Sequence, residues 1–550
     1  MSKYIVTILD STGIQSYIFT SNRLRENIGA SYLVEQATGN WVKDKLEELG
    51  VPKHRQNEPI TNSGLIAELV YAGGGNAMLL FKSMEDAKRF TRHLSRHILE
   101  YAPGINLVAA HKEFDWNELL YDVVQNLMDN ELEQQKRARV PSVPLLGLGI
   151  TASCNSTQLV AVNTSADYIQ ADEEDIYLIS SQTQAKLKAV SSKHGEPANK
   201  ALKKYFGDIL IEKNLQFPYR MDHLGRSQHE SSYYAVIHAD GNSMGKRFEA
   251  CGEEGKKCNP QDPNRGYIDC MRNLSKTVKK AGLSAMQTVV QTLANSIENG
   301  ELMGKFSIKD NYLPFRPLVY GGDDVTFVCD GRLGLELAAI YLEAFQEQKV
   351  ADFKVLTACA GVCIVKSHYP FARAYEMSEA LCSNAKKFLR KQEDKEFSAI
   401  DWHIASSGLF GSVGDIRQRE YQVAEGDLTM RPVMMQNETN QWRTWSNFRN
   451  LVKNFNEDKE WKGRRNKVIG LREKLRDGQE ATRQFLKAYR IDTLPPVKEV
   501  SDEIQTSGWV SDSDSENELL RCGYFDAIEA MEFYFPLNKG ESGDCLQTEN

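Results

Sequence analysis

Residues 317–328 read Pro-Leu-Val-Tyr-Gly-Gly-Asp-Asp-Val-Thr-Phe-Val, so two glycines and two aspartates stand between apolar flanks. Flanks rich in β-branched and aromatic residues predict two strands. Gly321 and Gly322 predict a tight turn with no side chains in the way of a bound ligand. The stretch is therefore expected to be a β-hairpin with Asp323 and Asp324 at its turn. Gly-Gly-Asp-Asp is also common in surface turns, so the hairpin alone does not identify a site.

A third carboxylate is expected to join this hairpin from an upstream strand. Residues 234–239 form a short apolar run that ends in Asp240 and Gly241. Carboxylates that meet at the edge of a sheet can hold divalent cations, and hard oxygen ligands suit Mg²⁺ or Mn²⁺ far better than zinc. Asp240, Asp323 and Asp324 are therefore the predicted catalytic residues and metal ligands.

The N-terminal part of the chain repeats this pattern. Residues 4–9 form an apolar strand before Asp10, and residues 69–81 form a glycine-bearing hairpin. A helix-like stretch and a further strand follow each hairpin, near residues 105–110 and 356–365. Two copies of one β–α–β–β–α–β unit explain this internal repeat.

The two copies differ where chemistry is expected. Gly75 and Asn76 stand in the first hairpin where Asp323 and Asp324 stand in the second. We therefore predict an α+β protein with two ferredoxin-like palm domains, the first degenerate and the second catalytic. Helical insertions and a helical C-terminal domain complete this prediction.

The expected domain boundaries follow from the repeat and from changes in composition. An amphipathic helix is expected in the insertion of the second palm, from apolar residues at helical spacing. These residues are Leu283, Met286, Val289, Val290 and Leu293. The predicted parts are residues 1–155 (degenerate palm), 156–230 (helical linker), 231–424 (catalytic palm with an insertion at 250–310), 425–537 (helical domain) and 538–550 (disordered tail).

Composition narrows the class of protein. The formal net charge of -8 argues mildly against a large nucleic-acid surface, although a local basic cleft stays open. The sequence has no secretory signal and no apolar run of about 18 residues, so we expect a cytoplasmic protein that does not enter a membrane. The ten cysteines are scattered, which predicts reduced thiols, but Cys251, Cys258 and Cys270 leave a zinc site open.

Other common catalytic motifs are missing from the sequence. The chain has no Walker A spacing, no HExxH and no GxSxG motif. His238, close to Asp240, is expected to pack in the core rather than to act as an acid or base. The basic runs at 136–139 and 462–467 are expected to be solvated faces, with nucleic-acid contact as the alternative.

Several stretches resemble one known family. They resemble the large subunit of type III CRISPR effector complexes, the Cas10 (Cmr2/Csm1-type) palm proteins, whose catalytic fold is shared with GGDEF cyclases. The similar stretches are residues 239–246, 320–324, 370–375 with 385–387, 13–18 with 29–33, 428–432 and 524–529. The resemblance spans nearly the whole chain.

This resemblance implies two palm domains that face each other with ATP between them. It implies that Asp240 and Asp323 hold the metal ions with Asp324 beside them. Lys386 or Lys387 would neutralise the triphosphate, unless both belong to a solvated helix face. The further nucleotide-binding residues implied are Gly241, Asn242, Ser243, Gly321 and Gly322 in the second palm, and Ser11, Gly73 and Gly74 in the first.

Two departures from the family pattern affect these expectations. Family members often carry an acid where Asn242 stands, so the first loop would bind metal with fewer charges. The sequence also contains no His-Asp dipeptide, and its first palm begins within ten residues of Met1. We therefore expect this chain to lack the nuclease domain that often precedes such palms.

The predicted activity is metal-dependent nucleotidyl transfer. A 3′-hydroxyl would attack the α-phosphate of ATP or a similar nucleotide and release pyrophosphate. The product would be a cyclic or linear oligonucleotide messenger in antiviral signalling, as the resemblance implies.

Two alternative functions stay open. In one, the chain is a scaffold of an RNA-guided complex, binds sister subunits and crRNA, and is activated by target RNA. In the other, it is a nucleotide sensor that has lost turnover.

Overall fold

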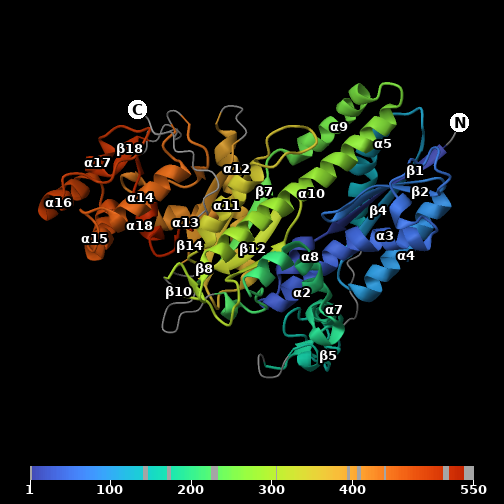
Figure 1. Ribbon diagram of the computed structural model, residues 1–550, viewed down its shortest axis with the longest axis horizontal. Helices are drawn as coiled ribbons and strands as arrows, with labels where there is room; N and C mark the ends of the chain where they lie inside the picture. Colours follow the sequence, from blue (N-terminus) through green and yellow to red (C-terminus); the bar gives the residue numbers. More distant parts are fainter. Residues whose placement is uncertain are drawn as a thin grey trace. The chain divides into compact units, whose positions relative to one another are not determined.

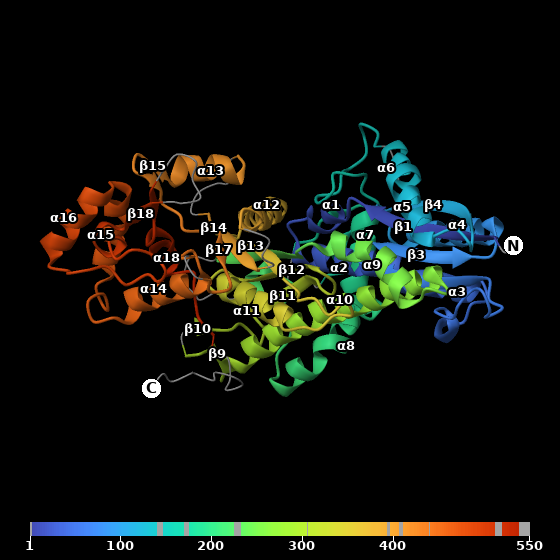
Figure 2. The ribbon, with the colours of Figure 1, turned by 90° about the horizontal axis from the view of Figure 1, so that it is seen from above.

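The structure is a computed structural model, and it divides the chain into two compact units. The described residues are 3–139, 147–169, 175–224, 233–304, 306–392, 397–405, 411–438, 441–511 and 520–537. Unit 1 comprises Met1–Asp208, Ser243–Leu283 and Lys349–Lys354, and unit 2 comprises Ile209–Asn242, Ser284–Gln348 and Val355–Asn550. Figures 1 and 2 show the ribbon from two directions. The predicted tail at 538–550 lies outside the described residues.

Unit 1 contains the first palm, a four-stranded antiparallel sheet with the order β2-β3-β1-β4. This is the strand order of a ferredoxin-like β–α–β–β–α–β unit. Its strands are β1 (Lys3–Thr12), β2 (Ala67–Gly73), β3 (Asn76–Phe81) and β4 (Asn106–Asp115). The helices α1 (Ile14–Phe19), α2 (Leu24–Glu35) and α3 (Trp41–Glu48) follow β1, and α4 (Met84–Tyr101) follows β3.

Unit 2 contains the second palm, which has the equivalent order β11-β12-β7-β13, extended by β14 and β17. Its strands are β7 (Tyr233–Gly241), β11 (Phe315–Val319), β12 (Asp324–Asp330), β13 (Ala358–Lys366), β14 (Ala399–Ile404) and β17 (Val433–Met434). The helices α11 (Gly334–Gln346) and α12 (Phe371–Arg390) pack on this sheet. The two predicted ferredoxin-like palms are therefore confirmed.

The strand registers show how closely the two palms correspond. Asp10 on β1 lies opposite Asn76 on β3, and Asp240 on β7 lies opposite Asp324 on β12. The first strand of each hairpin also carries an irregularity at the same place, between Leu69 and Tyr71 in β2 and between Pro317 and Val319 in β11. A bulge kinks a strand and increases its local twist, so both hairpins are bent in the same way.

Two helices form most of the predicted insertion, α9 (Met244–Cys258) and α10 (Pro263–Asn295). On α10 the predicted apolar face is buried at Met286, Val289, Val290 and Leu293, which are inaccessible to solvent, and half-buried at Leu283. Glycines allow α9 and α10 to approach closely, since a Cβ on Gly266 would lie 2.2 Å from the carbonyl oxygen of Gly255.

A disulfide joins the same two helices, between Cys251 and Cys270. The expectation of reduced thiols is therefore wrong for this pair, because the approach of α9 to α10 brings together two cysteines that are 19 residues apart. Cys258, the third cysteine of the group, is free and exposed.

The remaining elements include the predicted C-terminal helices, with one addition. The core of this region forms as α14 buries Trp445, Phe448, Leu451, Val452 and Phe455. Four short strands make a small sheet with the order β15-β16-β19-β18, which the sequence did not predict. None of the helices in the described ranges is long and apolar enough to cross a membrane.

The helices outside the two palms are α5 (Leu120–Asn126), α6 (Glu133–Ala138), α7 (Ser181–Val190), α8 (Pro197–Glu212), α13 (Val413–Glu420), α14 (Trp445–Glu457), α15 (Arg465–Arg476), α16 (Gln479–Tyr489), α17 (Ile504–Ser507) and α18 (Phe525–Ala530). The short strands are β5 (Asn163–Thr164), β6 (Leu178–Ile179), β8 (Ile297–Glu298), β9 (Glu301–Leu302), β10 (Phe306–Ser307), β15 (Gln422–Val423), β16 (Gly426–Asp427), β18 (Trp509–Ser511) and β19 (Leu520–Cys522). Single turns of 3₁₀- or π-helix are η1 (Gln36–Asn40), η2 (Lys53–Arg55), η3 (Leu127–Leu132), η4 (Ser165–Asp167), η5 (Ser192–His194) and η6 (Met221–His223).

Candidate active site at the second palm hairpin

Two of the predicted acids are brought together by strand pairing. Asp240 near the end of β7 and Asp324 at the start of β12 are direct cross-strand partners. Directly opposed residues project to the same face of a sheet, so both carboxylates lie on one side of this edge. Asp323 occupies the turn just before β12, where its carbonyl oxygen accepts a hydrogen bond from the Gly241 amide at 3.0 Å. Pairing of β7 with this hairpin thus assembles all three acids.

The two glycines of the hairpin adopt conformations that favour glycine. Gly321 has φ 91° and Gly322 has φ 123°. Other residues rarely adopt these angles, because the Cβ atom clashes with the backbone. Nothing lies within 4 Å of the position that a Cβ of Gly322 would occupy. The turn therefore leaves open space beside Asp323.

The structure distinguishes the two candidate lysines. The Lys386 Nζ donates to Asp240 Oδ2 at 2.6 Å and to the Gly241 carbonyl oxygen at 3.0 Å. Lys387, one residue further along α12, is exposed at the surface. Helical phase thus directs only Lys386 to the acids.

Asn242 and Ser243 each have a structural role in the loop after β7. The Asn242 side-chain amide donates to Thr357 Oγ1 at 3.1 Å and to the Phe397 carbonyl oxygen at 2.8 Å. These bonds tie the loop after β7 to the residues that lead into β13 and β14. Ser243 is the N-terminal cap residue of α9, with a left-handed φ of 57°. Their predicted contacts with a nucleotide stay predictions.

Two of the acids, Asp323 and Asp324, have a raised pKa. For Asp323, burial and then the charge of Asp240 raise the pKa of its carboxyl. For Asp324, burial of the carboxyl group is the largest cause, followed by the charges of Asp240, Asp323 and Glu379. Together these raise its pKa to about 7. This holds although half of the Asp324 side chain is accessible to solvent. A group of carboxylates that repel one another in this way would be stabilised by a cation.

His238 is buried beneath the acids, as expected for a packing residue. Its ring meets the edge of Tyr375 on α12, with 5.7 Å between centroids. Burial lowers the pKa of His238 to about 4, so the ring is neutral at pH 7. The expectation that His238 packs is confirmed.

One charged residue near the site was missed from the sequence. Glu379 lies on α12, seven residues before Lys386 and therefore on the same helix face. Its charge contributes to the raised pKa of Asp324. The helical spacing from Lys386 is the signal that could have identified it.

The donor set of this edge fits Mg²⁺ or Mn²⁺. No cluster of three or more His, Cys, Asp or Glu side chains arranged to hold a metal is found among the described residues. Mg²⁺ usually keeps several waters and takes only one or two carboxylates together with substrate phosphates. The opposed oxygens of Asp240 and Asp324 meet that requirement.

The equivalent edge of the first palm has no opposed acids. The Ser11 hydroxyl donates to the Gly75 carbonyl oxygen at 2.5 Å, so it ties the end of β1 to the hairpin turn. Gly73 and Gly74 form the turn with φ values of 134° and 66°, and Gly74 is exposed. Asp10 is paired with Lys136 of α6 at 2.8 Å.

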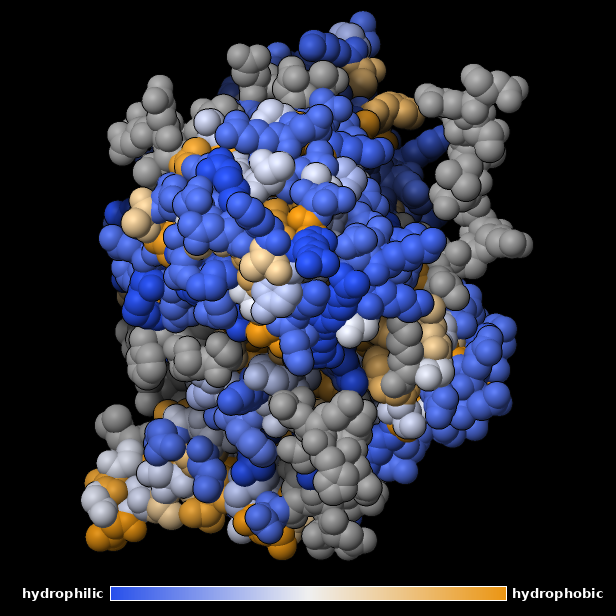
Figure 3. Space-filling view, turned by 90° about the vertical axis from the view of Figure 1, so that its left-hand side faces the viewer, coloured by the Kyte–Doolittle hydropathy of each residue, from blue (hydrophilic) through white to orange (hydrophobic). Residues whose placement is uncertain are grey.

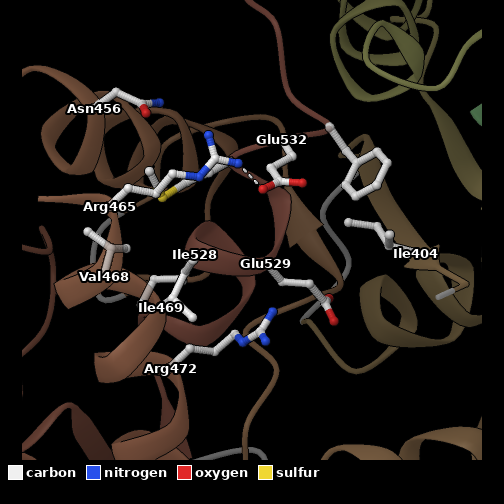
Figure 4. A pocket seen from close by; sticks show the side chains of 11 residues that line it. Ile404, Asn456, Arg465, Val468, Ile469, Arg472, Ile528, Glu529 and Glu532 are labelled. Atoms are coloured by element: carbon white, nitrogen blue, oxygen red, sulfur yellow. Dashed lines mark hydrogen bonds and ion pairs between the residues drawn. The ribbon is translucent and has the colours of Figure 1, made fainter. Parts of the chain in front are cut away.

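A cavity of about 290 Å³ opens elsewhere in unit 2, among the C-terminal helices. Arg465 and Arg472 of α15 line it together with Glu529, Glu532 and apolar side chains (Figure 4). An ion pair between Arg465 and Glu532 spans it. None of the predicted site residues lines this cavity.

Figure 3 shows a mainly hydrophilic molecular face with small, scattered apolar patches.

Comparisons with known proteins agree with the palm geometry. Residues 233–395 match the family model described as Cas10/Cmr2, second palm domain. No curated protein matches the chain.

Solved structures share the fold at low sequence identity. A chain in the crystal structure of a Csm1–Csm4 cassette with pppApApA has a TM-score of 0.52 and 13% identity, with 96% of this chain and 69% of that chain covered. The crystal structure of Csm1 in T. onnurineus has a TM-score of 0.52 and 13% identity, with 97% and 69% covered. A cassette with AMPPNP has a TM-score of 0.51 and 13% identity, with the same coverage of 97% and 69%. At this identity the likeness establishes the fold.

Proposed function

Since residues 233–395 match the model of the Cas10/Cmr2 second palm domain, we propose that this chain is a metal-dependent nucleotidyltransferase. Its reaction is the attack of a 3′-hydroxyl on the α-phosphate of ATP or another nucleoside triphosphate, with release of pyrophosphate. Its product is a cyclic or linear oligonucleotide messenger in antiviral signalling of the type III CRISPR kind.

The observation that carries this proposal is the pairing of Asp240 with Asp324 across β7 and β12, with Lys386 at 2.6 Å from Asp240. Opposed carboxylates beside an ammonium group and an open glycine turn can accept a metal-bound triphosphate. A divalent cation held there by Asp240, Asp323 and Asp324 would neutralise developing charge and lower the pKa of the attacking hydroxyl.

The protein's own groups would position the substrate. Lys386 balances the charge of Asp240 in the structure, and its ammonium would contact a phosphate oxygen of a bound nucleotide. Gly241, Gly321 and Gly322 would let the triphosphate approach the backbone. Positioning and electrostatic stabilisation supply most of the rate enhancement in such transfers.

The nucleotide ligands of similar structures support this substrate class. Cassettes of similar fold are complexes with pppApApA and with AMPPNP. In this chain, Asn242 and Ser243 of the second palm and Ser11, Gly73 and Gly74 of the first would contact nucleotides. Lys387 is exposed, so we assign it a weaker role than Lys386.

The test is to incubate the purified chain with each nucleoside triphosphate and Mg²⁺ or Mn²⁺, and to identify products by mass spectrometry. An Asp323→Ala/Asp324→Ala variant runs alongside. An oligonucleotide made by the wild type alone supports the proposal. Product made equally by both proteins would contradict it.

A second candidate function is that of a subunit in an RNA-guided complex, activated by target RNA. The similar structures favour it, because two of those reported are assemblies of Csm1 with Csm4. Affinity purification of the tagged chain from cells, with sequencing of bound RNA and identification of bound proteins, tests it. Recovery of sister subunits with crRNA supports this role, and recovery of the chain alone opposes it.

A further inference from the structure

A polar pair lies directly behind the opposed acids of the second palm. His238 on β7 and Thr326 on β12 are cross-strand partners, two residues along each strand from Asp240 and Asp324. Because strand side chains alternate between faces, residues two apart lie on the same face. The four side chains therefore form one block on one face of the sheet.

The imidazole contacts one of the two acids. The His238 Nδ1 lies 3.4 Å from Asp324 Oδ1 and 3.4 Å from Thr326 Oγ1. With its hydrogen on Nδ1, the ring would present a donor both to Thr326 Oγ1 and to an ionised Asp324, since a carboxylate only accepts hydrogen bonds. Half of the Asp324 side chain remains exposed, whereas His238 is 6% exposed. A buried ring nitrogen thus lies close to one oxygen of a half-exposed carboxyl group.

Helix α12 supports both acids, each in a different way. Lys386 reaches Asp240 directly, at 2.6 Å. Tyr375 lies eleven residues earlier, three helical turns away on the same face, and its ring packs against the His238 ring. The helix therefore contacts Asp240 directly through the Lys386 ammonium. It reaches Asp324 only indirectly, because Tyr375 packs against His238 and His238 lies beside Asp324.

The first palm provides an internal comparison. There Asp10 is opposite Asn76, and the residues two positions behind them are Ile8 and Met78. Both are buried and apolar. The polar pair accompanies the opposed acids and is replaced by apolar packing where the acid pair is missing.

We propose that His238, held by Thr326 and Tyr375, is a positioning residue that orients the Asp324 carboxylate for a divalent cation. A neutral donor suits this role, because it fixes the carboxylate while leaving its negative charge for the metal. Groups that hydrogen-bond to metal ligands commonly act in this way. The inference rests on the proposed metal-dependent function of the same site.

The test measures Mn²⁺ affinity of the full chain without nucleotide, by electron paramagnetic resonance, for four proteins. His238→Phe keeps a ring against Tyr375 but lacks the donor, and we expect its Mn²⁺ affinity to fall about 10–100-fold. His238→Asn keeps an N–H near the Nδ1 position and should remain within about threefold of the wild type. The matched control is Ile8→Val, at the equivalent place in the first palm, which should leave Mn²⁺ binding unchanged.

Several results would overturn this inference. Wild-type affinity in folded His238→Phe does so, and so does an equal loss in the Asn and Phe variants. If His238→Phe does not fold, Thr326→Val provides the test, since it keeps the shape and should still weaken Mn²⁺ binding about threefold or more. Activity that saturating Mn²⁺ cannot restore would show a role other than positioning a ligand. If the wild type binds Mn²⁺ tightly but makes no oligonucleotide, the proposed reaction fails while this inference stands.

Discussion

The two palms share strand order, register and a hairpin irregularity, yet they differ at the residues that could do chemistry. The second palm opposes Asp240 with Asp324, and the first opposes Asp10 with Asn76. A lysine contacts the first-strand acid in each palm, Lys386 in one and Lys136 in the other. The ammonium–carboxylate contact is therefore common to both palms. The second opposed acid, with the polar pair behind it, is what distinguishes the second palm.

The largest expected effect comes from removing the second acid. Asp324→Asn should lower product formation by about 10²–10³-fold or more, because it removes a ligand of the cation that would neutralise charge in the transition state. Asn76→Ala, the matched change in the first palm, should change the rate by less than about twofold, since it alters an exposed side chain. Initial rates of pyrophosphate release measure both. Similar losses in the two variants would break the distinction between the palms.

The second largest effect is expected from removing Lys386, the lysine that contacts Asp240, compared with Lys136, which contacts Asp10. Lys386→Ala should reduce kcat/KM for ATP about 100-fold, because this ammonium lies beside Asp240, where we propose that the triphosphate binds. Lys136→Ala and Lys387→Ala should each cost about threefold or less, as expected for surface charges. Steady-state kinetics at saturating Mg²⁺ distinguishes these cases. A loss of about 100-fold in Lys136→Ala would show that the first palm also binds a reacting phosphate.

The pH dependence of metal binding should sharpen the comparison. The pKa of Asp324 is raised from its ordinary value of 3.8 to about 7. A raised carboxyl pKa contributes stability that is fully present below about 3.8 and is lost as the pH rises through about 7. A cation should replace the proton above that pH. Mg²⁺ should therefore raise the Tm at pH 8 and have little effect at pH 5.

The same competition between a proton and a cation for Asp324 predicts how Mn²⁺ affinity depends on pH. It should fall about tenfold for each pH unit below 7, as one proton displaces the metal. Asp324→Asn should remove this slope, whereas Asp10→Asn in the first palm should retain it. Titrations at pH 6, 7 and 8 provide the measurement, and a pH-independent affinity would contradict the assigned role of Asp324.

The smallest expected effect is a gain in the first palm. Asn76→Asp would oppose two acids there, as in the second palm, but above Ile8 and Met78 instead of His238 and Thr326. We expect a second Mn²⁺ site at least about tenfold weaker than the first. Mn²⁺ stoichiometry by electron paramagnetic resonance measures it. Two sites of equal affinity would show that polar support contributes nothing.

The sequence predicted the palms because their signals are local. Apolar runs that end in turn formers predict strands, and the match between residues 69–81 and 317–328 revealed the repeat. Strand pairing then placed Asp240 opposite Asp324, as expected for a palm.

Other features depend on tertiary contacts that no local pattern reports. Helical phase chose Lys386 over Lys387, and the close packing of α9 on α10 brought Cys251 to Cys270. The small C-terminal sheet was missed because strands of two or three residues, such as β15 and β19, carry no periodic signal. The contact of His238 with Asp324 needed the strand register, which composition does not provide.

The central claim is that only the second palm carries out metal-dependent nucleotidyl transfer. The most direct test compares Asp240→Asn with Asp10→Asn, the equivalent first-strand acids, by pyrophosphate release from ATP with saturating Mn²⁺. We predict a loss of about 10²-fold or more for Asp240→Asn and a change within about threefold for Asp10→Asn. Equal rates in Asp240→Asn and the wild type, or equal losses in both variants, would contradict the claim.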